Sequence, residues 1–456
     1  MVDREIAVAG RKLAYSATTG TLDLKDGQGE TTAEIFYVSF TLTNGGDRER
    51  RPITYLFNGG PGASSAYLDI GAIGPRALEF GADGMFPPKS SRVVDNPDTW
   101  LPFTDLVFID PVGTGWSRAT DEDKTAKEFW TVSTDLEALA DVIRLHLTKT
   151  GRLASPVFLV GESYGGFRAA RLARDLATDH GIAAAGVMMI SPVLEFGLML
   201  GGALDPLSFA LRLPSYAAAT LGEKSLAPGA LADAEHFALH DYLVTLAAGP
   251  RDGEAAEHVY GKLAQLTGLD EDRIAGWRGR IPLEAYLGDL RRRDGRVTSR
   301  YDASVSGPDP NPANDDGHDD PVLDASIAPF TSAFVAYARD ELGYKTDRPF
   351  ELLNHDVSRH WDWGGRGALR SVGASDALRR ALALEPGLKV LIAHGVTDLQ
   401  TPYMMSRYVK DHMPEALGER IALKLYLGGH MLYLRAQSRH RLHDDAAEFY
   451  GGGEAP

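Results

Sequence analysis

The chain has 456 residues, 44% of them hydrophobic and 24% charged, so it can bury a full core and carry an insertion in a large domain. Its formal charge of −16 argues against nucleic acid or an anionic membrane surface as a partner. The chain contains no cysteine, which excludes disulfides and leaves the redox compartment open.

Strands predominate in the first third of the chain. The first five residues hold three charges and no apolar segment follows, so we expect no signal peptide and favour a cytoplasmic over a periplasmic or secreted location. Apolar runs predict strands at residues 12–15, 34–42, 53–57 and 106–109, and helical spacing over 132–147 predicts a helix that ends at a glycine. This alternation predicts an α/β fold whose sheet has helices on both faces.

The strand at 53–57 leads directly into a glycine-rich loop, NGGPGASS, at residues 58–65. An acyl-transfer enzyme needs backbone N–H groups aimed at the developing oxyanion, and a glycine-rich loop of this kind supplies one of them. We choose the N–H of Gly60, together with the N–H of Tyr164 from the next motif. The alternative is a merely structural Gly-Pro turn.

A second glycine motif, GESYG, occupies residues 161–165 after the apolar run at 156–160. A short strand that feeds a G-x-S-x-G turn at the start of a helix is how an α/β-hydrolase exposes a serine hydroxyl. The positive end of that helix would point at the reacting centre. Ser163 is therefore the candidate nucleophile, although the pentapeptide alone also fits an ordinary serine in a glycine turn.

The pattern changes after a strand at 187–190 and becomes helical and irregular, with the clearest helices at 231–246 and 326–342. The sheet resumes only at Leu388. We therefore predict a catalytic core formed by residues 1–195 and 348–456, with a mainly helical cap, or lid, inserted at 196–347. The apolar stretch at 196–213 is interrupted by glycine, aspartate and proline, so we interpret it as the start of the lid and not as a membrane span.

Two polar segments of the predicted cap need no functional explanation. The segment at 309–320 is rich in Asp and Asn but lacks the alternate ligands and closing glutamate of a calcium loop. Three consecutive arginines at 291–293 fit a solvated turn. We therefore predict no metal site.

Two late strands each end in glycine and a side chain that a serine nucleophile requires. The strand at 389–395 leads to Asp398, and the strand at 421–427 leads to His430. The order Ser, Asp, His is that of the α/β-hydrolase triad, in which His takes the serine proton and Asp orients the ring. His394 and His360 are weaker candidates for the base.

Together these motifs resemble those of the serine carboxypeptidases. The family has an N-G-G-P-G-x-S-S loop, a G-E-S-Y-x-G turn, a G-x-x-D loop and a G-H-M loop, and all four stand here in order, at residues 58, 161, 395 and 429. The resemblance implies release of C-terminal amino acids through an acyl-enzyme. It also implies that Asn58, Gly59 and Glu162 bind the free carboxylate of the substrate, which Glu162 can do as a donor when it is protonated.

Three positions depart from the family pattern. Leu56 stands where the family usually has Trp, and Ala72 stands where it usually has a second Glu that shares a proton with Glu162. Ala63 replaces the cysteine of the glycine loop. The first two departures bear on carboxylate recognition and its acidic preference, and we expect a milder decline with pH than a site with two glutamates would show.

The sequence thus predicts a serine-type carboxypeptidase that acts on peptides with a free C-terminus and needs no cofactor. The alternatives are an esterase or acyltransferase on the same scaffold, and a binding or scaffolding descendant without catalysis. The oligomeric state is left open, with a homodimer as one option, and no membrane partner is expected.

Overall fold

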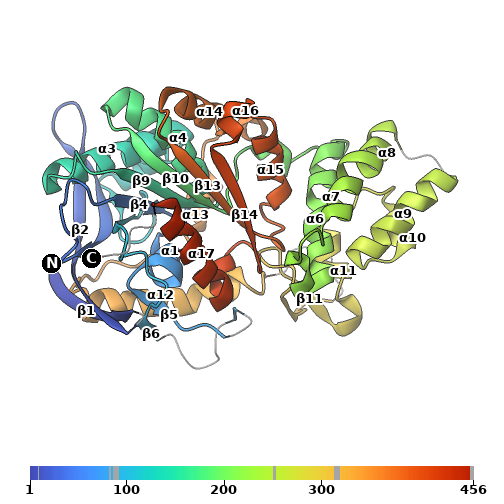
Figure 1. The fold of residues 1–456 in the computed structure, drawn as a ribbon, viewed down its shortest axis with the longest axis horizontal. Coiled ribbons are helices and arrows are strands. Elements are labelled where there is room, and N and C mark those ends of the chain that lie inside the picture. The colour runs from blue at the N-terminus through green and yellow to red at the C-terminus, as the bar shows by residue number, and fades with distance from the viewer. Residues whose placement is uncertain (9, 82–83, 86–91, 250–252, 313–318, 452–456) are drawn as a thin grey trace.

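A computed structural model describes residues 1–8, 10–81, 84–85, 92–249, 253–312 and 319–451 of the chain. Its centre is a 10-stranded sheet in the order β1-β2-β3-β7-β4-β9-β10-β13-β14, with β8 beside β3 (Figure 1). Two short hairpins, β5-β6 and β11-β12, stand apart from it. The strands are β1 (Val2–Val8), β2 (Arg11–Lys25), β3 (Thr31–Leu42), β4 (Ile53–Phe57), β5 (Arg76–Leu78), β6 (Val93–Asp95), β7 (Asp105–Ile109), β8 (Arg118–Ala119), β9 (Val157–Glu162), β10 (Ala184–Ile190), β11 (Arg296–Thr298), β12 (Ser306–Pro308), β13 (Lys389–Gly395) and β14 (Ile421–Tyr426).

Helices surround this sheet and build a second layer beside it. Within the described residues, none of them is both long and apolar enough to cross a membrane. The helices are α1 (Ala66–Leu68), α2 (Thr125–Phe129), α3 (Val132–Thr150), α4 (Tyr164–His180), α5 (Phe196–Met199), α6 (Pro206–Leu221), α7 (Ala232–Phe237), α8 (Leu243–Ala248), α9 (Glu254–Thr267), α10 (Glu271–Gly276), α11 (Leu283–Asp289), α12 (Leu323–Asp340), α13 (His355–His360), α14 (Ser375–Leu384), α15 (Tyr403–Asp411), α16 (Glu415–Gly418) and α17 (Ala436–Phe449). Short π- and 3₁₀-helical turns include η1 (Asp69–Ile73), η4 (Ala238–Tyr242) and η7 (Leu432–Leu434).

Both faces of the sheet are buried. Successive residues of each central strand point to opposite sides, and each side has its own core cluster. Leu159 belongs to a core cluster with α3, α4 and α14, whereas its neighbour Val160 belongs to a second cluster with α1, α12 and α17. Figure 1 shows α3, α4 and α14 along one side of the sheet and α1 and α12 along the other. The predicted α/β class with helices on both faces is confirmed.

The loops that carry the sequence motifs leave the sheet at one edge. Strands β4, β9, β10, β13 and β14 are adjacent in that order and run parallel. Their carboxyl ends therefore lie side by side, which is where open α/β sheets place their ligand sites. The glycine loop follows β4, the serine turn follows β9, and the Asp and His loops follow β13 and β14.

Helices α6 to α11 form a separate helical layer beyond β14, coloured green to yellow in Figure 1. They have a core cluster of their own, and α6 and α7 also pack against α15 of the sheet layer. The predicted helix at 231–246 appears here as α7, the π-helical turn η4 and α8. Helix α12 lies inside the range predicted as a cap, 196–347, but its buried face packs with the sheet cluster. The outer bounds of a cap stay a prediction.

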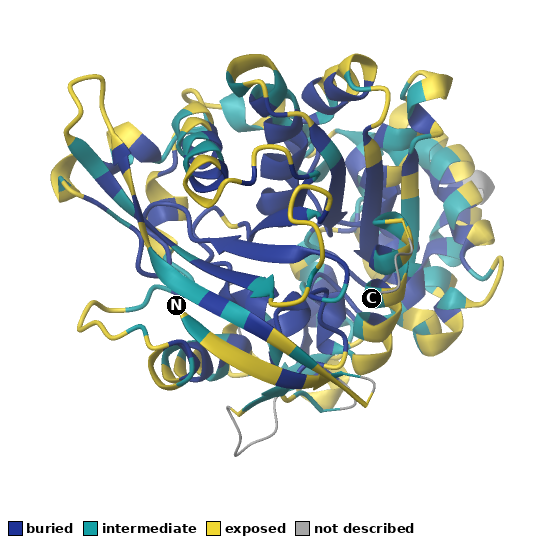
Figure 2. Cartoon of the chain, turned by 60° about the vertical axis from the view of Figure 1, so that its left-hand side comes forward, coloured by how far each residue is buried: buried dark blue, intermediate teal, exposed yellow. Residues whose placement is uncertain are grey.

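The N-terminal hairpin is longer than the sequence pattern predicts. Instead of a strand at 12–15, β2 runs from Arg11 to Lys25 and pairs antiparallel with β1 and β3. Figure 2 shows why the pattern is weak there, since much of this hairpin is exposed while the central strands are buried. An edge hairpin buries few side chains and so leaves little alternation in the sequence.

Candidate active site

Ser163 occupies a strained turn between β9 and α4. Its φ of 60° and ψ of −122° are rare for a residue with a side chain. A Cβ on Gly161 would lie 1.9 Å from the carbonyl oxygen of Gly165, and a Cβ on Gly165 would lie 2.2 Å from that of Phe57. Both glycines of the motif are therefore needed for close backbone approach. Ser163 is half-buried, whereas its neighbours Glu162 and Tyr164 are buried.

His430 and Asp398 form a buried hydrogen-bonded pair. The Nδ1–H of His430 donates to Oδ2 of Asp398 at 2.8 Å, and the two side chains are 2% and 0% exposed. The other oxygen, Oδ1, accepts the N–H groups of Gln400 at 2.8 Å and Thr401 at 2.9 Å. The acceptor-only carboxylate requires the proton on Nδ1, which leaves Nε2 of His430 free to take another.

Electrostatic attraction also stabilises the pair of Asp398 and His430. Burial disfavours ionisation of Asp398, but the charge and hydrogen bond of His430 outweigh it and hold the pKa of Asp398 below its usual value. Burial also disfavours the charged imidazole, but Asp398 and Glu162 together raise the pKa of His430. The site therefore favours an imidazolium, which is what a general base becomes after it takes a proton.

The loops that carry Ser163 and His430 are fastened to the same strand end. The N–H of Ser163 donates to the carbonyl of Ile190 at 2.9 Å, and the hydroxyl of Ser191 donates to the carbonyl of His430 at 2.8 Å. Tyr301 packs its ring edge-on against the imidazole, with centroids 5.0 Å apart. In the described part of the chain no hydrogen bond joins Ser163 Oγ to the imidazole, a contact that in free enzymes often forms only with substrate.

The glycine loop that contains Gly60 lies against the serine turn that contains Tyr164, the two predicted oxyanion donors. A Cβ on Gly59 would come within 2.6 Å of the nitrogen of Tyr164 and 2.9 Å of Cβ of Ser163, so the glycine loop touches the serine turn. Tyr164 is the first residue of α4, and its N–H has no intrahelical acceptor. Gly60, at φ 98°, follows in a conformation that suits glycine.

Asp110 holds this loop from behind, a role that the sequence reasoning missed. Its Oδ1 accepts the hydroxyl of Ser64 and the N–H of Ser65, each at 2.8 Å. Burial raises the pKa of Asp110 to about 6, although these two donors oppose the rise. The available signal was its position directly after strand β7.

Asn58, Gly59 and Glu162 are the three residues predicted to bind a carboxylate. The structure brings Asn58 and Glu162 into contact, and Gly59 is the residue after Asn58 in the chain. Glu162 is 3% exposed, and its Oε2 accepts from Nδ2 of Asn58 at 2.8 Å. It also accepts from the hydroxyl of Tyr433 at 2.7 Å, which the sequence reasoning did not foresee. Burial raises the pKa of Glu162 to about 7, against the opposing effects of His430 and the two donors. Glu162 can therefore carry a proton in mildly acidic solution.

A fully buried ion pair supports the backbone of this site. Nη1 of Arg168 donates to the carbonyl of Asn58 at 2.6 Å. The other guanidinium nitrogens bind both oxygens of Asp135 at 2.8 and 2.9 Å. Because the Asn58 carbonyl and the Gly59 N–H belong to one peptide unit, a charged donor on the first polarises the second. The sequence hinted at this pair only through an aspartate on the apolar face of the helix at 132–147.

The weaker histidine candidates lie apart from this chemistry. His394 is fully buried and bonded through Nε2 to Ser406 at 2.8 Å, and burial lowers its pKa to about 4. His360 is exposed and stacks on Trp130. Neither is hydrogen-bonded to Ser163 or Asp398 among the described contacts.

The two polar segments of the helical region differ in their distance from the site, since Asp319 and Asp320 at the end of the Asp-rich segment line a cavity beside Gly60. Residues 313–318 of the Asp-rich segment lie outside the described residues, and the arginines at 291–293 are exposed. Asp320 accepts the hydroxyl of Ser299 at 2.8 Å and the N–H of Arg300 at 2.7 Å. The described part of the chain contains no group of three side chains placed to hold a metal ion.

A cavity of about 510 Å³ opens from the glycine loop toward the helical layer. The sheet layer contributes Gly60 and Gln400 to its wall, and the helical layer contributes Glu284 and Leu287. It adjoins the predicted oxyanion loop and the loop of Asp398, so it is the space in which a substrate side chain can lie.

Comparison with known proteins agrees with these motifs. Residues 11–191 match the family model described as serine carboxypeptidase. This part of the chain is therefore similar to the serine carboxypeptidase family. The chain is 32% identical over 126 residues to the retinoid-inducible serine carboxypeptidase of Rattus norvegicus, covering 27% of this chain and 25% of that protein. It is 35% identical over 127 residues to the serine carboxypeptidase-like 51 protein of Arabidopsis thaliana, covering 26% and 24%.

A solved structure shares the fold of this chain along almost its whole length. The prohormone-processing carboxypeptidase Kex1 from Saccharomyces cerevisiae aligns with a TM-score of 0.61 and 16% identity, covering 96% of this chain and 91% of that one. This likeness shows the α/β-hydrolase fold. The sequence matches span about a quarter of the two curated relatives' length.

Proposed function

We propose that this protein is a serine-type carboxypeptidase that releases C-terminal amino acids from peptides through an acyl-enzyme. The observation that carries the proposal is the buried Glu162, bonded to Asn58 and adjoining Ser163 in the chain. With its raised pKa, Glu162 is still protonated in mildly acidic solution, where an ordinary surface glutamate is ionised. The protonated acid can donate a hydrogen bond to a free carboxylate, which an ionised glutamate cannot do.

Binding places the last peptide bond at Ser163. The terminal carboxylate receives hydrogen bonds from the N–H of Gly59, the amide of Asn58 and the proton of Glu162. Donors at one end of the substrate fix the position of the scissile carbonyl relative to the nucleophile, which lowers the entropic cost of reaching the transition state.

Acylation then proceeds through the Ser163, His430 and Asp398 triad. Ser163 Oγ attacks the carbonyl carbon while Nε2 of His430 takes the hydroxyl proton, and the N–H groups of Gly60 and Tyr164 donate to the resulting oxyanion. The tetrahedral intermediate collapses with cleavage of the C–N bond, and His430 gives its proton to the leaving amine. Water repeats the sequence on the ester, which regenerates Ser163 and frees the shortened peptide.

The same triad would also serve an esterase or acyltransferase, because it does not distinguish an amine from an alcohol as leaving group. The Asn58 and Glu162 pair favours the carboxypeptidase, since neither alternative needs a protonated acid beside the nucleophile. A non-catalytic scaffold would not need the strained turn at Ser163 or the buried pair of Asp398 and His430.

The proposal is tested with an N-blocked dipeptide that carries a free carboxylate and with its C-terminal amide. We expect rapid cleavage of the acid and slow cleavage of the amide at about pH 5.5, because only the acid engages a protonated Glu162. A fluorophosphonate should label Ser163, and Ser163→Ala should lower kcat by a factor on the order of 10⁶. Ser133→Ala on the exposed face of α3 is the matched control.

Three results would reject the proposal. They are labelling of a different serine, retention of activity in Ser163→Ala, or equal rates for the acid and the amide. Equal rates together with Ser163 labelling would support the esterase alternative.

A further inference from the structure

The two oxygens of the Glu162 carboxyl group have different surroundings. Oε2 accepts two hydrogen bonds, from Nδ2 of Asn58 at 2.8 Å and from the hydroxyl of Tyr433 at 2.7 Å. A carbonyl-type oxygen offers two lone pairs, so both are occupied. A proton on Oε2 would have to displace one of these donors.

Oε1 is left as the reactive end of the group. Within the described residues Oε1 accepts no hydrogen bond. An atom without a partner is either completely buried or in contact with solvent, and Oε1 is not completely buried. It therefore still reaches solvent, although the whole Glu162 residue is only 3% exposed. The acid proton has its place on Oε1, where it can be donated to a ligand.

Tyr433 is held rigidly in this arrangement. It lies in η7, three residues after His430, and is fully buried. A Cβ on Gly71 would come within 3.0 Å of its ring, so the phenol packs directly against the turn that also contains Ala72. Burial raises the pKa of the Tyr433 hydroxyl well above its usual value, so the hydroxyl keeps its proton and acts as a donor to Glu162.

We propose that Tyr433 is a positioning residue of the carboxylate site. By occupying Oε2 of Glu162, its hydroxyl reserves Oε1 as the oxygen that carries the acid proton and donates to the terminal carboxylate of a peptide. The last step of this inference, donation to a peptide, rests on the proposed carboxypeptidase function. The hydrogen-bond arrangement and its effect on the titration of Glu162 do not.

The inference also explains how the site works with Ala72 in place of a second glutamate. A second acid would share a titrating proton with Glu162, whereas Tyr433 supplies a hydroxyl that stays protonated. Among the described residues, the other titratable groups that interact electrostatically with Glu162 include one imidazole, one carboxylate and two phenols. They are His430, Asp398, Tyr67 and Tyr301.

The test is Tyr433→Phe, which removes the hydroxyl and keeps the ring against Gly71. Loss of a donor to the ionised carboxylate should raise the pKa of Glu162, so the increase in KM for free-carboxylate peptides should move to higher pH. At about pH 5.5 the kcat/KM for such peptides should fall about tenfold, because the proton is no longer confined to Oε1. Hydrolysis of an ester without a carboxylate should change less than about threefold.

Two controls separate a positioning role from a structural one. Tyr67→Phe removes another buried hydroxyl near Glu162 that does not bond to it, and it should leave the pH profile unchanged. In a Glu162→Gln background, Tyr433→Phe should no longer shift the profile, because glutamine does not titrate.

A measurement that needs no activity makes the inference independent of the proposed function. In protein labelled with ¹³C at the glutamate carboxyl carbon, the Glu162 signal is assigned by its loss in Glu162→Gln, and its titration is compared with that in Tyr433→Phe. An upward shift of the midpoint is the expected result. An unchanged midpoint, or a loss of peptide and ester turnover in equal proportion, would overturn the role of Tyr433. Absence of carboxypeptidase activity in the wild type would instead reject the proposed function.

Discussion

Replacing Glu162 by glutamine should stabilise the protein in neutral solution and have little effect in acid. Burial raises the pKa of Glu162 from its usual 4.5 to about 7, so the folded state binds the proton more tightly than the unfolded state does. The contribution of protonated Glu162 to the free energy of unfolding is therefore fully present below about pH 4.5, and it is lost progressively as the pH rises to about 7. Glutamine keeps the shape of the neutral acid and removes the ionisation.

The size of the effect follows from the shift. At about 1.4 kcal/mol for each pH unit between 4.5 and about 7, ionisation of Glu162 costs the folded state up to about 3 kcal/mol. This is a large fraction of the free energy of unfolding of a typical domain, which is roughly 5–15 kcal/mol. In Glu162→Gln the carbonyl can accept from Asn58 and Tyr433, so no new unpaired group is buried.

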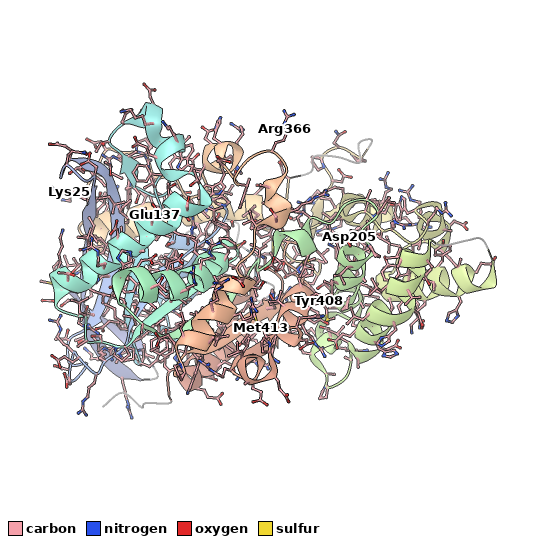
Figure 3. The ribbon with its side chains drawn as sticks, turned by 90° about the horizontal axis from the view of Figure 1, so that it is seen from above. Lys25, Glu137, Asp205, Arg366, Tyr408 and Met413 are labelled. Carbon is pink, nitrogen blue, oxygen red and sulfur yellow. The ribbon has the colours of Figure 1, made fainter. Side chains whose placement is uncertain are left out.

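The assay is urea denaturation of the wild type and Glu162→Gln at a series of pH values from about 4 to 8. The difference in the free energy of unfolding should grow with pH and level off above about pH 7. Glu137→Gln, on the exposed face of α3, is the matched control (Figure 3). A difference for Glu162→Gln that is constant with pH would refute the reasoning, because it would mean that the carboxyl titrates alike in both states.

Two further substitutions address buried charges around the site. Both oxygens of Asp69 are buried without a partner in the described structure, and burial together with Asp110 raises the pKa of Asp69 well above its usual value. Asp69→Asn should therefore raise Tm relative to the wild type at about pH 8 and much less at about pH 4, as measured by scanning calorimetry. Arg168→Leu should cost about 3–5 kcal/mol in urea denaturation, because Asp135 is left buried and unpaired. The double variant with Asp135→Leu should recover part of that loss, and recovery of none would argue against pairing as the cause.

The positions of the three triad candidates relative to the sheet could be predicted because their signals are local. A strand, a tight glycine turn and a functional side chain follow one another within about ten residues. Parallel strands then bring their carboxyl ends to one edge, so order along the chain was enough to place Ser163, Asp398 and His430 at the same edge of the sheet. The structure places these loops as the strand pattern predicts, while their roles in catalysis stay a proposal.

The supporting residues could not be predicted because their contacts join distant parts of the chain. Tyr433 is 271 residues from Glu162, and Arg168 is 110 residues from the carbonyl that it holds. In the sequence Tyr433 is one aromatic residue after a histidine, and Arg168 is one of several arginines in a helix. Only the packing of η7 against η1, and of α4 against α3, gives them a partner.

The layering of the helical region had a similar limit. A helix in an inserted layer and a helix on the sheet share the same 3.6-residue period, so α6 and α12 look alike in sequence. Their partners differ: α6 packs with α9 and α15, whereas α12 contacts α1 and shares a core cluster with sheet residues such as Leu56 and Ile190. Periodicity reports that a face is buried and not what buries it.

The pH dependence of carboxylate binding depends both on the sequence motifs and on the surroundings of Glu162. The motifs place an acid beside the nucleophile, and Ala72, where the family usually has a second glutamate, predicts a milder decline of carboxylate binding with pH. The structure adds the surroundings of that acid, because burial raises the pKa of Glu162 to about 7 even though Tyr433 and Asn58 stabilise the ionised form. The decline of carboxylate binding should accordingly lie near neutral pH, and its midpoint depends on Tyr433, a residue outside the motifs.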